Sequence, residues 1–364
     1  MCSKAGNPAA SGVVLADDAT GALECASVLA GLGFDVALTL DAEPQLRHGI
    51  LVADTESRHL LAADAGRRIG RWSERTAAAI FKKTDSTLRG NIAAELLALL
   101  SRGPLVYVPA YPKLGRTVLD GRLVVNGIPV DQTEFARDAL HPVRSSVVAH
   151  LFPAGSVVSI RDAKQLACFL ALREAKIAIC DAASGEDLRA IAEALRGNEV
   201  TVAGPSGFIG HWASLGTFPR KLPATAPVVR NWLVVCGSRH PRSRRQAHLA
   251  ERSGLTVLLG AEEELSPEAA ATELARRAVK CIGECIGECP RGPAGRPVLP
   301  LGVVVMGGDT AWALWRALGI SDLTPLPEVL PGVAACLSGD LLFVTKAGGF
   351  GEDDLVTRVM ERFV

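Results

Sequence analysis

The sequence predicts an α/β protein of two domains, a parallel-sheet α/β domain over residues 1–227 and a second α/β domain over residues 228–364. Short apolar runs rich in β-branched residues alternate with helix-like stretches, which indicates parallel strands joined by right-handed crossovers. Most runs are apolar at every position, as expected for a sheet covered by helices on both faces. The proline-rich segment 217–231 has no periodicity and separates the two domains.

The strands of the first domain follow from these apolar runs. Helix-like stretches between them, such as "TGALECASVLAGLG", end in glycine, which is typical of a helix C-terminus. We expect strands over residues 12–16, 35–40, 49–53, 78–81, 105–109, 157–160, 176–180 and 200–204.

The segment "GRLVVNGIPVDQTEF" (121–135) departs from the strand–helix alternation. It places two short apolar runs around Asn126-Gly127, and both residues tolerate the positive φ of a type I′ turn. The sequence therefore predicts a β-hairpin at the edge of the first domain.

The second domain repeats one pattern, in which a strand is followed by a glycine-containing turn and a helix. The three copies are "WLVVCGSRHPRSRRQ", "LGVVVMGGDTAWALW" and "LLFVTKAGGFGEDDL". Backbone N–H groups at such helix starts bind phosphate, because they lack partners within the helix and the helix dipole favours anions. None of the turns is a Walker A loop or a dinucleotide fingerprint. Together they indicate a nucleotide site, with Lys346 placed to contact phosphate oxygens.

The charge balance excludes some classes of partner. Lys+Arg and Asp+Glu both number 39, so the formal net charge is zero. A nucleic-acid or membrane-surface binder normally carries a basic face, and no run approaches the roughly 18 apolar residues of a membrane span. We therefore expect neither nucleic acid nor membrane as a partner, and small molecules instead.

The nine cysteines and the first residues indicate the compartment. The number is odd and several cysteines lie in apolar runs, which fits free thiols in a reducing compartment. The first residues lack an apolar signal core, so we expect a cytoplasmic protein.

A tandem repeat, "CIGECIGECP", spaces Cys281, Cys285 and Cys289 by four residues. This spacing matches neither a zinc pair nor a usual iron–sulfur run. We interpret the repeat as an expanded loop, and its role stays open.

Polar residues follow four apolar runs of the first domain, where ligands collect in parallel sheets. Carboxylates accept hydrogen bonds from sugar hydroxyls, and arginine offers a planar fork for a carboxylate. A small polyhydroxy acid therefore fits this edge. Asn91 is expected to cap the following helix, and Lys82 to be solvated. The polar residues that we expect to bind this ligand are Asp17, Asp18, Asp85, Arg89 and Arg116.

The chain resembles the four-carbon acid sugar kinase family along nearly its whole length. The resemblance rests on "ADDATGA" (16–22), "FKKTDSTLRGNIAAEL" (81–96), the segment 107–143, "CGSRHPRSRRQ" (236–246), "GGDTA" (307–311) and "TKAGGFGEDD" (345–354). It implies an N-terminal domain that binds the sugar acid and a C-terminal domain that binds ATP. The implied reaction transfers the γ-phosphoryl group to a terminal hydroxyl of threonate, erythronate or 3-oxo-tetronate. ATP and Mg²⁺ are the implied cofactors, the Mg²⁺ ligands are not identified, and a homo-oligomer is left open.

The resemblance also assigns residues by position. The sugar acid would contact Asp17, Asp18, Lys83, Asp85, Arg89 and Arg116. The nucleotide would contact Gly237, Ser238, Gly307, Gly308, Asp309, Thr310, Lys346, Gly348 and Gly349. Our hypothesis is that Arg89 and Arg116 hold the carboxylate, and that Asp85, with Asp17 next, accepts the proton of the attacked hydroxyl.

Three departures from the family leave alternatives open. The chain is short, residues 259–300 are low in complexity, and the turn after residue 236 is rich in arginine. The alternatives are a kinase of a related hydroxy acid and a non-catalytic sugar-acid-binding protein with a degenerate nucleotide site. A dehydrogenase is disfavoured because no G-x-G-x-x-G follows any strand.

Overall fold

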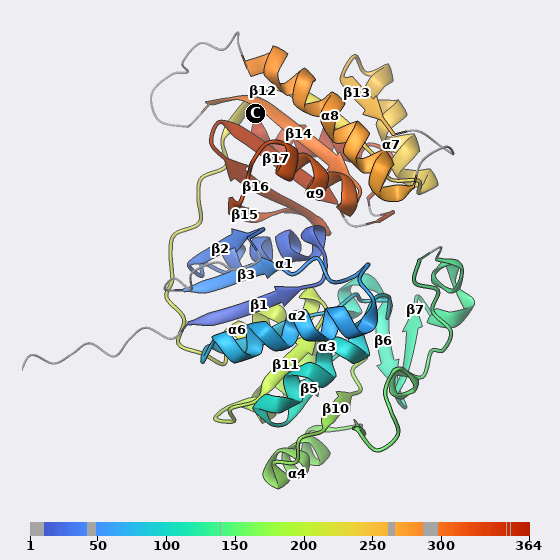
Figure 1. The fold of residues 1–364 in the computed structure, drawn as a ribbon. Helices are drawn as coiled ribbons and strands as arrows, with labels where there is room; N and C mark the ends of the chain where they lie inside the picture. Colours follow the sequence, from blue (N-terminus) through green and yellow to red (C-terminus); the bar gives the residue numbers. More distant parts are fainter. Residues whose placement is uncertain are drawn as a thin grey trace, which may run out of the picture. The chain divides into compact units, whose positions relative to one another are not determined.

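The computed structural model describes residues 11–41, 49–138, 140–260, 266–286, 298–346, 348–349 and 351–364. The chain divides into two compact units, residues 1–18 with 45–220 and residues 19–44 with 221–364 (Figure 1). Residues 19–44 therefore differ from the predicted domain boundaries. Their helix packs on strands of the second unit, and their strand pairs there.

The first unit is built on a parallel sheet. Its strands lie in the order β3-β1-β4-β11-β5-β10-β9, and each described neighbouring pair is parallel. Each confirms a predicted strand: β1 (Gly12–Ala16), β3 (Ile50–Asp54), β4 (Ala79–Lys83), β5 (Leu105–Tyr107), β9 (Val157–Ile160), β10 (Ile177–Cys180) and β11 (Thr201–Gly204). The helices of this unit are α2 (Ala62–Arg75), α3 (Ile92–Ala98), α4 (Ala163–Leu172), α5 (Gly185–Leu195) and α6 (Ile209–Ala213).

Helices cover both faces of this sheet, as the apolar runs predicted. Successive residues of a strand point to opposite faces. In β4 the Phe81 ring lies 5.6 Å from the ring of Trp212 in α6, whereas Lys82 pairs with Glu95 in α3. Therefore α6 and α3 lie on opposite faces, and α2 lies beside α3 (Figure 1).

The predicted hairpin at Asn126-Gly127 is confirmed as part of a small three-stranded antiparallel sheet. Its strands are β6 (Arg116–Leu119), β7 (Arg122–Val125) and β8 (Ile128–Pro129). Asn126 and Gly127 both have positive φ, 49° and 85°. A second tight turn at Asp120-Gly121, with φ of 48° and 70°, joins β6 to β7 and was not predicted, although Asp-Gly is a hairpin signal as well.

The second unit contains a mixed sheet. The order is β13-β12-β14-β17-β16-β15-β2, in which β13, β12, β14 and β17 are parallel and the remaining pairs are antiparallel. The strands are β2 (Val36–Thr39), β12 (Val228–Cys236), β13 (Thr256–Leu259), β14 (Val298–Met306), β15 (Asp322–Leu330), β16 (Val333–Ser338) and β17 (Leu341–Lys346). The helices are α1 (Ala19–Gly31), α7 (Pro241–Arg252), α8 (Pro267–Ile286), α9 (Gly308–Ala317) and α10 (Leu355–Met360).

The strand predicted over residues 35–40 exists, but the parallel pairing expected for it is wrong. Leu38 and Thr39 of β2 pair antiparallel with Leu323 and Asp322 of β15. The apolar run predicts a strand but carries no information about its partner.

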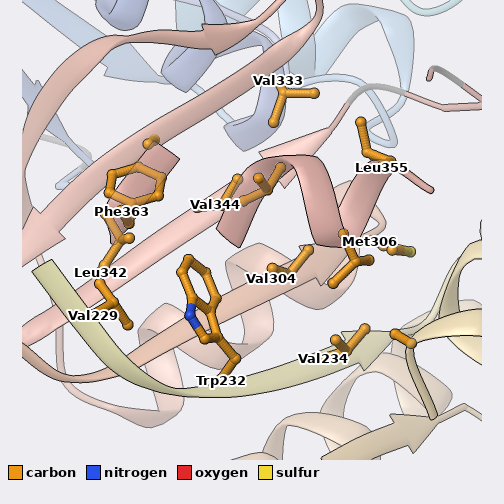
Figure 2. Close-up of a cluster of buried hydrophobic side chains, with 14 of the residues drawn as sticks. Val229, Trp232, Val234, Val304, Met306, Val333, Leu342, Val344, Leu355 and Phe363 are labelled. Carbon is orange, nitrogen blue, oxygen red and sulfur yellow. The ribbon is translucent and has the colours of Figure 1, made fainter. Parts of the chain in front are cut away.

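The core of the second unit follows the two-residue period of its strands. Leu342 and Val344 of β17 join a cluster with side chains of α7 and α10, whereas the ring of Phe343 contacts Trp315 of α9. Figure 2 shows Leu342, Val344 and Trp232 in this cluster. Thus α7 and α10 cover one face and α9 covers the other.

No helix among the described residues is long and apolar enough to cross a membrane.

The core of the second unit can be tested with Leu342→Ala. Leu342 is fully buried, so removing its side chain should lower the free energy of unfolding by about 2–5 kcal/mol. Leu222→Ala is the matched control, because Leu222 is 90% exposed and its loss leaves no cavity. Urea unfolding followed by circular dichroism measures both variants, and equal shifts of the midpoint would contradict this description of the core.

Candidate functional site

The polar residues predicted for the first unit follow three neighbouring strands. Leu15 of β1 is in register with Ala53 of β3 on one side and Lys82 of β4 on the other. The residues after these strands therefore emerge at one edge of the sheet. The chain continues from β3 to β4 across β1, so the strand order reverses there, which is where open parallel sheets bind ligands.

The guanidinium of Arg58, which follows β3, contacts the aspartates that follow β1 and β4. Its Nε lies 2.8 Å from Asp17 Oδ2 and its Nη1 lies 2.7 Å from Asp18 Oδ2. Its Nη2 lies 3.9 Å from Asp85 Oδ2. Lys83 Nζ adds a second cation, 3.8 Å from Asp17 Oδ1 and 3.6 Å from Asp18 Oδ1.

These charges control the ionisation of the buried carboxylates. Burial opposes the ionisation of Asp17, but the charges of Arg58 and Lys83 outweigh it and hold its pKa well below the ordinary value. Burial likewise opposes the ionisation of Asp85, and Arg89 and Arg58 hold its pKa far below the usual range. Both carboxyls are therefore ionised at neutral pH.

Asp54, at the end of β3, behaves in the opposite way. Burial, reinforced by the negative charges of Asp18 and Glu56, raises its pKa to about 8, although the backbone N–H of Glu56 donates to its Oδ1 at 2.9 Å. At pH 7 this carboxyl is mostly protonated and adds little negative charge to the edge.

The buried polar atoms without a hydrogen-bond partner among the described residues include two around the Arg58 guanidinium. They are Asp17 Oδ1, an acceptor, and Arg58 Nη2, a donor, and Oδ2 of Asp54, at the end of β3, also has none. Asp17 is 2% exposed and the Arg58 side chain is 13% exposed, so bulk water does not readily satisfy them. Buried polar groups in proteins are nearly always paired, which makes this donor and acceptor a candidate site for a polar ligand.

Arg89, which was predicted to hold a carboxylate, is engaged within the protein. Its Nη2 donates to Asp85 Oδ2 at 2.8 Å and its Nη1 to Asp138 Oδ2 at 3.2 Å. Its guanidinium also lies 5.3 Å from the centre of the Phe135 ring. Asp138 connects the segment after the small sheet to this cluster.

For two residues of the segment 82–91, the contacts that we expected of the side chain were wrong. Lys82 is completely buried rather than solvated, and its Nζ lies 3.0 Å from Glu95 Oε2, because the strand period turns it toward α3. Asn91 immediately precedes α3, but its side chain makes no capping bond. Its Nδ2 instead donates to the carbonyl oxygens of Ser57 and Leu60, each at 2.9 Å, and so anchors the Arg58 loop.

The structure brings Asp17, Asp18, Lys83, Asp85 and Arg89 together in one cluster. Arg116 lies at the start of β6, is largely buried, and donates from Nη1 to the carbonyl oxygen of Leu114 at 3.4 Å. Its part in ligand binding stays a prediction.

In the second unit, three parallel strands end level with one another. Cys236 of β12 is in register with Met306 of β14, which is in register with Lys346 of β17. The three predicted glycine turns therefore begin side by side at one edge. The strand order also reverses between β12 and β14, because the chain visits β13 on the far side of β12 before returning.

Glycine is required where two of these turns meet. A Cβ on Gly237 would collide with the hydroxyl of Thr310 in α9. Gly307 has a φ of 121°, which other residues rarely adopt, and it precedes α9 directly. The backbone N–H groups of Gly237 and Ser238 both donate to the carbonyl oxygen of Met306, at 3.0 and 2.9 Å.

Lys346 reaches across to the third turn and to α7. Its Nζ donates to Ser243 Oγ at 2.9 Å and to the carbonyl oxygen of Gly348 at 2.6 Å. Burial lowers its pKa to about 8. A Cβ on Gly349 would collide with the ring of His240, so this turn also lies close against the start of α7.

The cysteine repeat lies on α8 as far as it is described. Cys281 and Cys285 belong to α8 and are free thiols, whereas Cys289 lies outside the described residues. Within the described ranges, no group of three or more His, Cys, Asp or Glu side chains could hold a metal ion.

Sequence reasoning missed several residues that the structure places at these sites. Arg58 follows the strand predicted over residues 49–53, and Ser243 lies in the segment after residue 236, so their positions after predicted strands could have assigned both to a site. Asp138 and Glu95 gave weaker signals. Asp138 is distant in sequence from the other aspartates, and Glu95 is a single carboxylate in the otherwise apolar helix "IAAELLA".

Comparisons with known proteins agree with this division of roles. The pattern of a sugar-binding N-terminal domain matches residues 12–212, and that of a nucleotide-binding C-terminal domain matches residues 285–356. A solved structure from Haemophilus influenzae covers 97% of this chain and 100% of its own at a TM-score of 0.68, and its 19% identity supports the fold alone.

Relatives at higher identity span nearly the whole chain. A D-threonate kinase of Bordetella bronchiseptica is 32% identical in an alignment of 395 positions that covers 96% of this chain and 96% of its own. A D-threonate kinase of Cupriavidus necator is 31% identical over 94% of this chain and 95% of its own. A solved structure from Bordetella bronchiseptica, with bound citrate and a domain-swapped dimer, is 28% identical at a TM-score of 0.51, covering 98% of each chain. With both domain patterns present and kinases of four-carbon sugar acids aligned from end to end, the chain belongs to the four-carbon acid sugar kinase family.

Proposed function

We propose that this protein is an ATP-dependent kinase that phosphorylates the terminal hydroxyl of a four-carbon sugar acid, and that D-threonate is its substrate. The choice of D-threonate is supported by the two D-threonate kinases that align along nearly the whole chain. The relatives named D-erythronate kinase and 3-oxo-tetronate kinase match only 41% and 36% of it.

The observation that carries this proposal is the pair of buried atoms without a hydrogen-bond partner, Asp17 Oδ1 and Arg58 Nη2, at the edge of the first sheet. Asp17 Oδ1 accepts a hydrogen bond from a hydroxyl, and Arg58 Nη2 donates one to a carboxylate or hydroxyl oxygen. A polyhydroxy acid supplies both groups on one small molecule. Lys83 Nζ, 3.8 Å from Asp17 Oδ1, is close enough for an oxygen bound there to contact both.

We propose roles for the remaining predicted residues. Arg89 holds Asp85 and Asp138, and in our proposal it exchanges its bond with Asp138 for the substrate carboxylate. Arg116 is proposed as a further contact of that carboxylate. Asp18 keeps Arg58 in place through its 2.7 Å ion pair.

The geometry favours Asp17 over Asp85 as the proton acceptor. Both oxygens of Asp85 are engaged, Oδ1 by the backbone N–H and hydroxyl of Thr87 and Oδ2 by Arg89. Asp17 has one oxygen left for the attacked hydroxyl. Phosphoryl transfer needs this group mainly to orient the hydroxyl, so a low pKa does not disqualify it.

The glycine turns of the second unit are proposed to bind the phosphates of ATP. Gly307 and Gly308 would present backbone N–H groups, with Gly237, Ser238, Thr310, Lys346, Gly348 and Gly349 around them. Asp309, in the first turn of α9, fits Mg²⁺, which usually takes one or two carboxylates together with phosphate oxygens. When bound, the ion would neutralise charge on the phosphates.

Two broader expectations accompany this function. We propose a cytoplasmic location, which the free cysteines among the described residues support. We also propose a homo-oligomer, which the domain-swapped dimer of the Bordetella bronchiseptica relative supports.

The substrate can be identified by ATP consumption with each stereoisomer of threonate, erythronate and 3-oxo-tetronate. We expect the highest kcat/KM with D-threonate. Turnover only with another hydroxy acid would favour the alternative of a kinase that acts on a related hydroxy acid. Absence of both turnover and thermal stabilisation by ATP with Mg²⁺ would favour the non-catalytic binding protein and overturn the proposal.

The role of Arg58 can be tested with Arg58→Lys. Lysine keeps the charge but cannot bind Asp17 and Asp18 while also presenting the Nη2 donor. The variant should therefore lose about 2–5 kcal/mol of transition-state stabilisation, which is measured as a lower kcat/KM for the sugar acid. The Kd for ATP should stay unchanged. Arg67→Lys, in the exposed ion pair with Asp64, is the matched control and should retain activity.

The proton acceptor can be tested by comparing Asp17→Asn with Asp85→Asn. Asp17→Asn should lower kcat by about 10²–10⁴-fold, because the amide cannot accept the proton. Asp85→Asn should act mainly on KM, because Asp85 holds Arg89. Steady-state kinetics with the best sugar acid distinguishes them, and a larger loss of kcat in Asp85→Asn would return that role to Asp85.

The contact between Lys346 and phosphate predicts a pH dependence. A pKa of about 8 means that Lys346 is mostly charged at pH 7 and mostly neutral at pH 9. Phosphate binding requires the charged form, so the Kd for ATP should rise by roughly tenfold between these pH values. Lys346→Arg stays charged and should show a flatter profile by titration calorimetry. Parallel profiles in the two proteins would exclude Lys346 from phosphate binding.

A further inference from the structure

A chain of buried polar groups lies beneath the Arg58 loop. Lys82 Nζ lies 3.0 Å from Glu95 Oε2, and Glu95 Oε1 is hydrogen-bonded to Ser57 Oγ. Ser57 Oγ lies 2.8 Å from Thr55 Oγ1, which lies 2.6 Å from the carbonyl oxygen of Ala16. These side chains are at most 3% exposed, so water does not take part readily.

The number of protons in this chain determines the state of Glu95. Three oxygen–oxygen contacts are of hydrogen-bond length: Glu95 to Ser57, Ser57 to Thr55, and Thr55 to the carbonyl oxygen of Ala16. Each contact needs one proton. The two hydroxyls supply only two, and a carbonyl oxygen supplies none. If each contact holds its own proton, the third comes from the Glu95 carboxyl.

We propose that Glu95 is a protonated carboxyl that positions the Arg58 loop and leaves Lys82 as a buried cation near Asp17. With the proton on Oε1, Glu95 donates to Ser57, Ser57 donates to Thr55, and Thr55 donates to the Ala16 carbonyl. Oε2 then remains the acceptor for Lys82 Nζ. All three contacts are satisfied in this arrangement.

The charged groups facing Glu95 are consistent with this state. Burial raises the pKa of Glu95, the charge of Lys82 opposes the rise, and the charge of Asp17 adds to it. A neutral Glu95 does not cancel the positive charge of Lys82, which is one of the charges that keep Asp17 ionised.

The chain connects to the site through the backbone of the loop. The N–H groups of Ser57 and Arg58 both donate to the carbonyl oxygen of Asp17 at 3.2 Å. Lys82 Nζ also donates to the carbonyl oxygen of Lys83 at 2.8 Å. Glu95 thus acts through Ser57 on Arg58, and through Lys82 on the end of β4. Its positioning role rests on the proposed function of the Arg58 cluster.

The protonation state can be tested without any substrate. In the full-length protein at pH 7, the infrared difference between wild type and Glu95→Gln should show a protonated carboxyl band lost from the wild type. Glutamine reproduces a neutral carboxyl, since its amide donates to Ser57 and accepts from Lys82. Its melting temperature should therefore stay within about 2 °C of wild type, comparable to Glu273→Gln at an exposed ion pair.

Removing the hydrogen bonds should have a different effect. Glu95→Leu leaves Lys82 and Ser57 without these partners and should lower the melting temperature by about 10 °C. With the sugar acid, Glu95→Leu should raise KM at least tenfold, whereas the KM of Glu95→Gln should stay within about threefold of the wild-type value. The pH profile of Glu95→Gln should have the same acid limb as that of the wild type.

The opposite outcomes overturn the proposal. If Glu95 is ionised, the carboxyl band is absent and Glu95→Gln melts as low as Glu95→Leu. If both variants melt as expected but share the wild-type KM, Glu95 is structural only. Absence of turnover with every sugar acid would count against the proposed function, while the infrared result would still decide the state of Glu95.

Discussion

The burial of the Arg58 guanidinium among Asp17, Asp18 and Asp85 is the interaction on which the first unit's site depends. A buried charge is costly unless it is paired or hydrogen-bonded, so these four side chains stabilise one another only when they are held together. Three adjacent strands deliver the aspartates and the Arg58 loop to one edge. The pairing then leaves one acceptor and one donor over, which is what a small polar ligand requires.

The two units apply the same topological rule with different chemistry. In each, the strand order reverses at a central strand, and the turns after neighbouring parallel strands meet. The first unit fills this place with charged side chains, which suit the hydroxyls and carboxylate of a sugar acid. The second fills it with glycines whose backbone lies against Thr310 and His240, which suits phosphates approaching N–H groups closely.

Local patterns were sufficient for the strands of the first sheet, the turn at Asn126-Gly127 and the three glycine turns. They were insufficient for the antiparallel pairing of β2 with β15 and for β15 and β16 themselves. An apolar run shows that a strand is buried but not which strand lies beside it. The placement of residues 19–44 in the second unit was missed for the same reason, since the pairing partners are nearly 300 residues apart.

The sequence by itself determined which polar residues follow each strand, because the hydrophobic patterns of strands and helices are set by neighbouring residues. These patterns place Asp17, Lys83 and Lys346 at strand ends. Only the tertiary structure decided their partners. Lys82 was expected in solvent, yet the strand period and the position of α3 bury it against Glu95. Arg58 became the centre of its cluster because β1, β3 and β4 lie side by side. Contacts between residues far apart in sequence depend on packing, and no local pattern encodes them.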